Sequence, residues 1–393
     1  MTSRKHRIRV RGILAGADAP SDLLLKDGQI QEIKLAGRGA PDIGSDTCII
    51  APTLFDIQVN GAKGIDLQGD SVTPDDVCAL TDFLVTQGVS HWIPTLITGP
   101  AEHMRHGCAV IAAAMQNPRV QRAIPGIHLE GPFISPEDGA RGAHDKNHVR
   151  PPSLEEFDGF MKAADGHIAY ITVAPEVEGA VDFIREVTRR KVRVALGHHN
   201  ASSLEIERAV EAGAVLTTHL GNGLVGTMDR HHNPLWPQLA NDNLSASLIA
   251  DLEHLPPPVL RAFVRAKEPQ RVILVSDCVH LAGLKPGEYE LGGIPVELTP
   301  SGRICLSGTE YLAGSSLMLL QGVINAVRAT DLTLRQALAS ASSVPANLLG
   351  LKHPFRLPKT GTKANFMAFT ITKGQEKWKT NIKAVFVDGE QRA

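Results

Sequence analysis

Eight apolar runs alternate with amphipathic segments through the middle of the chain, and this pattern constrains the fold more than any other feature. The runs cover residues 52–59, 89–97, 123–129, 168–174, 192–196, 214–218, 244–250 and 271–275. Segments with helical periodicity lie between most of these runs, at 74–87, 101–115, 177–190, 203–212 and 258–267. Two more follow the last run, at 316–329 and 334–342. Strands that alternate with helices indicate an α/β fold. A count of eight favours a (β/α)8 TIM-like barrel over an open doubly wound sheet.

The two ends of the chain have strand-like patterns without a helical period. Short runs occupy residues 8–14, 22–26, 29–35 and 48–51, and others follow at 366–372 and 382–387. The dipeptide Asp27-Gly28 between two of these runs is a hairpin signal. Because chain termini often lie close together, we expect residues 1–50 and 352–393 to form one small β-sandwich domain. The barrel domain would then span residues 51–351.

Composition excludes several classes of partner. The net charge of -2 over 393 residues gives no reason to expect nucleic acid or an acidic membrane surface. No apolar run reaches the roughly 18 residues that a membrane helix needs, and no apolar segment after the basic start suggests secretion. The five cysteines are scattered without a CxxC pair. Reduced thiols and a cytoplasmic location are therefore expected.

Polar residues repeat where the apolar runs end. Glu130, Glu176, the pair His198-His199, His219, Asp251 and Asp277 all follow such runs. In a barrel these ends open onto one face, which carries the active site. One Glu and two His are a common ligand set for a divalent ion such as zinc, which activates water. Asp277 would then take the proton of that water and pass it to a leaving group, as hydrolysis of an amide or ester requires.

The sequence also resembles a known family, the N-acetylglucosamine-6-phosphate deacetylases of the amidohydrolase superfamily. The resemblance covers nearly the whole chain in order. Its most specific segments are His128-Leu129-Glu130-Gly131-Pro132-Phe133, Arg141-Gly142-Ala143-His144, Gly197-His198-His199-Asn200-Ala201, Thr218-His219-Leu220-Gly221-Asn222, Ile249-Ala250-Asp251 and Val275-Ser276-Asp277. It implies hydrolysis of the N-acetyl group of N-acetylglucosamine 6-phosphate, a small amino-sugar substrate, by a homodimer.

The resemblance also implies roles for single residues. Glu130, His198 and His219 would hold one metal ion per subunit, with His198 preferred to its neighbour His199. Asp277 and His144 would be catalytic, and His144 would also contact the substrate. The other implied substrate-binding residues are Asn222, Gly223, Arg230 and His254. Many members of the superfamily bind a second metal through a His-x-His pair, where this chain has Gln58 and Asn60. Amides are poorer metal ligands than imidazole, which favours a single ion.

The loop after the sixth strand departs from the family pattern. Family members carry His-Arg-Glu-Pro-Gly there, and its arginine reaches the sugar phosphate. Here residues 228–236 allow either Arg230 or His232 to occupy the arginine's position. Glu253 adds a negative charge near the sugar site. Two alternatives therefore stay open: an unphosphorylated or differently decorated N-acyl amino sugar as substrate, or a non-catalytic sugar-binding protein. Intact Glu130 and Asp277 argue against the second.

Overall fold

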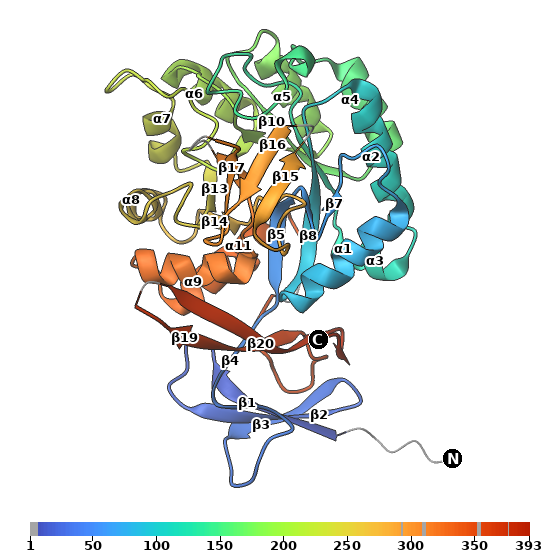
Figure 1. Cartoon of the computed structure of the whole chain (residues 1–393), viewed down its shortest axis with the longest axis vertical. Helices are drawn as coiled ribbons and strands as arrows, with labels where there is room; N and C mark the ends of the chain where they lie inside the picture. Colours follow the sequence, from blue (N-terminus) through green and yellow to red (C-terminus); the bar gives the residue numbers. More distant parts are fainter. Residues whose placement is uncertain (1–6, 292–293, 309–311, 352–354, 376) are drawn as a thin grey trace.

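A computed structural model describes residues 7–291, 294–308, 312–351, 355–375 and 377–393 (Figure 1). Its centre is a sheet of eight parallel strands in the order β14-β13-β12-β11-β10-β9-β8-β5. These strands are β5 (Leu54–Val59), β8 (Val89–Ile97), β9 (Ile127–Glu130), β10 (Ile168–Val173), β11 (Arg193–Leu196), β12 (Ala214–Thr217), β13 (Ser245–Ile249) and β14 (Val272–Val275). A parallel bridge between Val59 and Cys278 joins the two edges and nearly closes the ring. The predicted barrel is confirmed.

Helices surround this barrel (Figure 1). They are α1 (Pro74–Thr86), α2 (Ala101–Ala114), α3 (Pro118–Ala123), α4 (Leu154–Ala163), α5 (Ala180–Arg189), α6 (Ser203–Ala212), α7 (Leu235–Ala240), α8 (Pro257–Lys267), α9 (Leu319–Ala329), α10 (Leu334–Ser340) and α11 (Ser343–Leu348), with a 3-10 turn at Lys146–His148. The sequence marks several starts: Thr73, Ser202 and Thr333 each close a capping box. None of the helices in the described ranges is long and apolar enough to cross a membrane.

Both chain ends enter one sheet of seven strands, separate from the barrel sheet, in the order β21-β20-β19-β4-β1-β2-β3. The strands are β1 (Arg7–Leu14), β2 (Pro20–Lys26), β3 (Gln29–Leu35), β4 (Ile43–Ala51), β19 (Phe366–Lys373), β20 (Trp378–Val387) and β21 (Glu390–Gln391). Val10, Ile30, Phe366 and Phe386 share one apolar core, so residues from the two ends pack together as expected. Figure 1 shows β19 and β20 between α9 and β1–β3.

A four-stranded antiparallel sheet follows the last barrel strand, and the sequence patterns did not reveal it. It consists of β15 (Gly287–Leu291), β16 (Ile294–Leu298), β17 (Arg303–Leu306) and β18 (Leu312–Ser315). A parallel bridge from Cys278 to Ser315 connects it to the barrel. A two-stranded ribbon, β6 (Gly61–Ala62) with β7 (Ile65–Asp66), also follows β5. We name the four-stranded unit the inserted sheet.

Candidate metal centre

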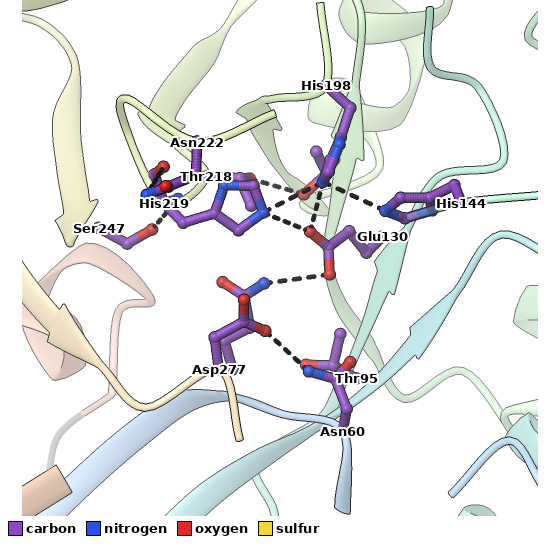
Figure 2. Close-up of polar contacts among 12 residues, drawn as sticks. Asn60, Thr95, Glu130, His144, His198, Thr218, His219, Asn222, Ser247 and Asp277 are labelled. Carbon is purple, nitrogen blue, oxygen red and sulfur yellow. Dashed lines mark hydrogen bonds and ion pairs between the residues drawn. The ribbon is translucent and has the colours of Figure 1, made fainter. Parts of the chain in front are cut away.

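Glu130, the last residue of β9, lies at the centre of a buried polar cluster (Figure 2). Its Oε1 atom is 2.9 Å from His198 Nε2 and 2.8 Å from His219 Nε2, and these two nitrogens are 3.1 Å apart. Its other oxygen, Oε2, accepts a hydrogen bond of 3.0 Å from Gln58 Nε2. A buried carboxylate requires such partners. The structure thus brings together three residues that the sequence places on different strands.

The backbone turns sharply where the clustered side chains leave the strands. His198, His219 and Asp277 have φ values of 53°, 28° and 49°, in the left-handed region that residues other than glycine rarely adopt. Each lies two positions after the end of its strand, β11, β12 or β14. Such strained conformations gather at functional sites because the surrounding structure must hold them. Here they accompany the turn of each side chain into the mouth of the barrel.

The surroundings of His198 leave its Nε2 atom available as a ligand. Its Nδ1 lies 3.1 Å from the carbonyl oxygen of Ala140, and a carbonyl can only accept, so Nδ1 carries the proton. In the neutral ring, Nε2 then presents a lone pair toward Glu130 Oε1, which also presents lone pairs. A cation between them would satisfy both. Tetrahedral zinc ligands lie about 3.3 Å apart when each is about 2.0 Å from the ion, close to the spacings seen here.

Two sets of three residues could hold the ion, because His144 also approaches the cluster. Glu130, His144 and His198 offer ligand atoms within 4.8 Å of one another, and so do Glu130, His198 and His219 by the distances above. The Nδ1 atom of His144 lies 3.3 Å from the backbone nitrogen of Thr98 and 2.8 Å from its hydroxyl oxygen, and His144 Nε2 lies 3.2 Å from His198 Nε2. Burial holds the pKa of His144 well below its usual value, so the ring is neutral. Both sets of three therefore place a neutral or carboxylate-paired imidazole beside Glu130 and His198.

Charges in the cluster are strongly coupled. Burial would raise the pKa of Glu130, but the imidazoles of His198 and His219 close to its carboxylate hold it well below the usual value. Burial would likewise lower the pKa of His219, yet the hydrogen bond and charge of Glu130 raise it to about 9. Glu130 therefore attracts positive charge strongly. An environment of this kind suits a divalent ion.

Asp277 faces this centre from the end of β14 (Figure 2). Burial raises its pKa to about 7, and the negative charge of Glu130 adds to that effect. Asn60 opposes the shift because its Nδ2 donates a 2.8 Å hydrogen bond to Asp277 Oδ1. A carboxyl group that titrates near neutrality can both accept and return a proton.

The family profile for amidohydrolases matches residues 49–392. The chain belongs to the amidohydrolase family. It is 31% identical over 395 residues to an N-acetylglucosamine-6-phosphate deacetylase from Bos taurus, covering 97% of this chain and 93% of that protein. It is 30% identical over 366 residues to an N-acetylgalactosamine-6-phosphate deacetylase from Escherichia coli O157:H7, covering 92% and 94%. This amidohydrolase is thus an enzyme of the hydrolase class, and the sequence resemblance to the deacetylase branch is confirmed.

Solved structures agree on the fold. The N-acetyl-D-glucosamine-6-phosphate deacetylase of Mycobacterium smegmatis superposes with a TM-score of 0.84 at 24% identity, covering 98% of this chain and 99% of that chain. The superposition includes both the barrel and the sheet from the termini, since nearly the whole of each chain is covered. The architecture of this amidohydrolase is therefore that of the deacetylase.

Several residues predicted for the substrate site border the cluster. Asn222 Nδ2 donates to the carbonyl of His219 at 3.2 Å. Gly223 packs so closely on His198 that an added Cβ would lie 2.8 Å from its Nδ1. His254 Nδ1 lies 2.6 Å from Asp251 Oδ2, which fixes the orientation of the ring. Among the described residues, all three predicted positions lie next to the centre or to a strand end of the same barrel face.

Other predicted residues lie apart from the cluster. His199 is buried, and its Nδ1 accepts from the N–H of Ala201 at 3.3 Å; burial lowers the pKa of His199 to about 4. Glu176 Oε1 accepts a hydrogen bond of 2.7 Å from the backbone N–H of Asn200, which links the segments that follow β10 and β11. Arg230 and His232 are exposed. Within the described residues, no hydrogen bond or ion pair joins either side chain to Glu130 or its partners.

Sequence reasoning missed the residues that orient the cluster. Gln58 and Asn60 entered only as poor metal ligands, yet they bond Glu130 and Asp277 directly. Thr98 holds the ring of His144 in place through its backbone nitrogen and its hydroxyl group. All three positions lie in or just after predicted strands, so their place on the barrel face could have been inferred. Their partners could not, because a pairing across the barrel depends on three-dimensional register.

Proposed function

We propose that this chain hydrolyses the N-acetyl group of N-acetylglucosamine 6-phosphate, giving glucosamine 6-phosphate and acetate. The observation that carries the proposal is the convergence of Glu130, His198 and His219 on one point, with Asp277 facing it. An amide is a poor electrophile, and this set of groups supplies what its hydrolysis by water needs. The relatives named above, which are deacetylases of amino-sugar phosphates, support the substrate class.

We propose one divalent ion per subunit, held by Glu130, His198 and His219, with zinc as the ion. When bound, it would supply a Lewis acid that lowers the pKa of the attacking water. The lone pairs of His198 Nε2 and Glu130 Oε1, facing each other at 2.9 Å, support this assignment. Gln58 would orient Glu130 from outside the ligand set through its 3.0 Å hydrogen bond.

The remaining roles follow from what each side chain can donate or accept. Asp277 would take a proton from the attacking water and deliver it to the amine nitrogen as the C–N bond breaks. His144 would donate a ring N–H to the acetyl carbonyl oxygen as negative charge develops there. His254, Asn222 and Gly223 would contact the sugar.

We assign Arg230 to the phosphate, with His232 as the alternative at the same place. Arg230 is exposed on its own subunit, which supports its donation across a homodimer interface to the partner's site. We also propose a cytoplasmic setting, which is supported by the absence of disulfides at Cys48, Cys78, Cys108 and Cys278. Residues 51–351 would form the catalytic domain, with residues 1–50 and 352–393 as the small domain beside it.

A second substrate has a specific observation in its favour. The Escherichia coli O157:H7 relative is named for N-acetylgalactosamine 6-phosphate and is as similar to this chain as the relatives named for N-acetylglucosamine 6-phosphate. The two sugars differ only in the configuration of one hydroxyl group. Acetate release should therefore be measured from both phosphorylated sugars and from N-acetylglucosamine without the phosphate.

The test uses full-length protein loaded with zinc, and the same protein after treatment with a chelator. We expect release from N-acetylglucosamine 6-phosphate to be the fastest and to depend on the metal. Faster release from N-acetylgalactosamine 6-phosphate, or from the unphosphorylated sugar, would show that this sugar is the preferred substrate instead. No release from any of the three would overturn the deacetylase assignment.

A further inference from the structure

The inserted sheet brings a basic residue to the mouth of the barrel. Cys278, directly after Asp277, pairs with Ser315 of β18, and Ser315 in turn pairs with Arg303 of β17. Neighbouring strands lie about 4.8 Å apart, so the backbone of Arg303 is roughly 10 Å from that of Cys278. This pairing places Arg303 within side-chain reach of the face that carries the site.

Arg303 lies beside an acidic residue of the sugar site. Its Nε atom is 3.9 Å from Glu253 Oε2; the side chain of Arg303 is half-buried, and that of Glu253 is exposed. Glu253 immediately precedes His254, and the backbone N–H groups of both donate to Asp251 Oδ1 at 2.9 Å. Glu253, which pairs with Arg303, is therefore held in the same turn as His254, which we assign to the sugar.

The charge of Glu253 poses a problem for the proposed substrate. A sugar phosphate carries between one and two negative charges near neutrality, and a carboxylate beside its binding site repels it. A guanidinium next to that carboxylate offsets the repulsion and can bind phosphate oxygens in a bidentate manner. Arg141, another arginine near the cluster, is directed to the carbonyl of His144 and to Asp138 at 2.7 Å.

We propose that Arg303 determines specificity for an anionic group on the sugar, by neutralising Glu253 and by binding that group within the same subunit. This inference rests on the proposed function, since it concerns the same site. It differs from the assignment of Arg230, because Arg303 needs no partner subunit. The inserted sheet would thus have a role in substrate recognition.

The experiment compares Arg303→Gln, Glu253→Gln and the double variant in the zinc-loaded, full-length protein. The matched control is Arg265→Gln, because Arg265 also pairs with a carboxylate, Asp331, at 2.6 Å but on the outer helix α8. We measure kcat/KM for acetate release from N-acetylglucosamine with and without the 6-phosphate. The affinities for glucosamine 6-phosphate and glucosamine are measured separately by calorimetry.

Arg303→Gln should lower kcat/KM for the phosphorylated sugar at least about tenfold more than for the unphosphorylated one, mainly through KM. Glu253→Gln should raise the preference for phosphate, and the double variant should lose that gain. Equal effects on both sugars, or an effect no larger than that of Arg265→Gln, would overturn the inference. If Arg303→Gln does not fold, Arg303→Lys should still weaken the phosphate preference, since it keeps the charge without the planar fork.

The binding measurement separates this inference from the proposed function. If wild-type protein releases no acetate from either sugar, the proposed reaction is wrong. Calorimetry still decides the role of Arg303 in that event: a preference for glucosamine 6-phosphate over glucosamine that falls in Arg303→Gln supports it. The absence of such a preference in the wild-type protein, or its persistence in Arg303→Gln, contradicts it.

Discussion

Replacing Asn60 with alanine should move the acidic limb of the pH–rate profile to higher pH. Asn60 Nδ2 donates its 2.8 Å hydrogen bond to the ionised form of Asp277, and so opposes the burial that raises the pKa of Asp277 to about 7. As a general base, Asp277 is active when ionised, so kcat/KM falls as the pH drops below its pKa. Without the donor, the pKa rises and activity is lost at higher pH.

The size of the shift follows from the hydrogen bond. A hydrogen bond to a charged group contributes about 1.5–3 kcal/mol, and one pKa unit corresponds to about 1.4 kcal/mol. We therefore expect the limb to move up by about one to two pH units. Well below the limb, kcat/KM of Asn60→Ala should be about 10 to 100 times lower than that of wild type. At a pH well above both pKa values the two proteins should become similar.

The assay is kcat/KM for acetate release from N-acetylglucosamine 6-phosphate, measured from pH 5 to 10 with saturating zinc. Asn117→Ala is the matched control, because Asn117 caps α3 through the N–H of Arg119 and lies outside the site. Asn60→Asp should shift the limb further than Asn60→Ala, since a second carboxylate repels the charge on Asp277. A limb that stays in place in Asn60→Ala, or moves to lower pH, would show that ionisation of Asp277 does not control the reaction.

Three further changes test other parts of the site. Asp277→Asn should lower kcat by about 10²–10⁴ while the bound zinc, measured by elemental analysis, is unchanged; retained turnover would exclude Asp277 as the base. Gln58→Leu removes the hydrogen bond to Glu130 Oε2 and should weaken zinc affinity about 10- to 100-fold in a chelator competition; an unchanged affinity would refute its orienting role. Lys267→Met leaves two carbonyls at the end of α7 without their buried ammonium and should cost about 2–4 kcal/mol in urea unfolding; an unchanged midpoint would contradict this.

The barrel and the polar residues clustered at its mouth could be predicted because their signals are local. In the sequence, a buried parallel strand is a run of apolar residues, so a charged residue at its end is easily recognised. Glu130, His219 and Asp277 were found in this way. Because neighbouring residues on a strand face opposite sides, only one of His198 and His199 was expected to face the barrel mouth, and the family resemblance selected His198. The structure agrees, since His198 points to Glu130 and His199 does not.

What the sequence did not reveal depends on contacts between distant segments. The inserted sheet was missed because polar residues interrupt its strands, so none of them forms a continuous apolar run like those of the buried barrel strands. The position of Arg303 was missed for the same reason. It is set by the pairing of Arg303 with Ser315, which in turn bridges to Cys278, and no local sequence pattern indicates it. The residues proposed for the reaction follow buried barrel strands, each of which is an apolar run in the sequence, whereas the proposed role of Arg303 depends on the pairing of the inserted sheet. The proposed chemistry could therefore be inferred from the sequence, while the proposed specificity needed the structure.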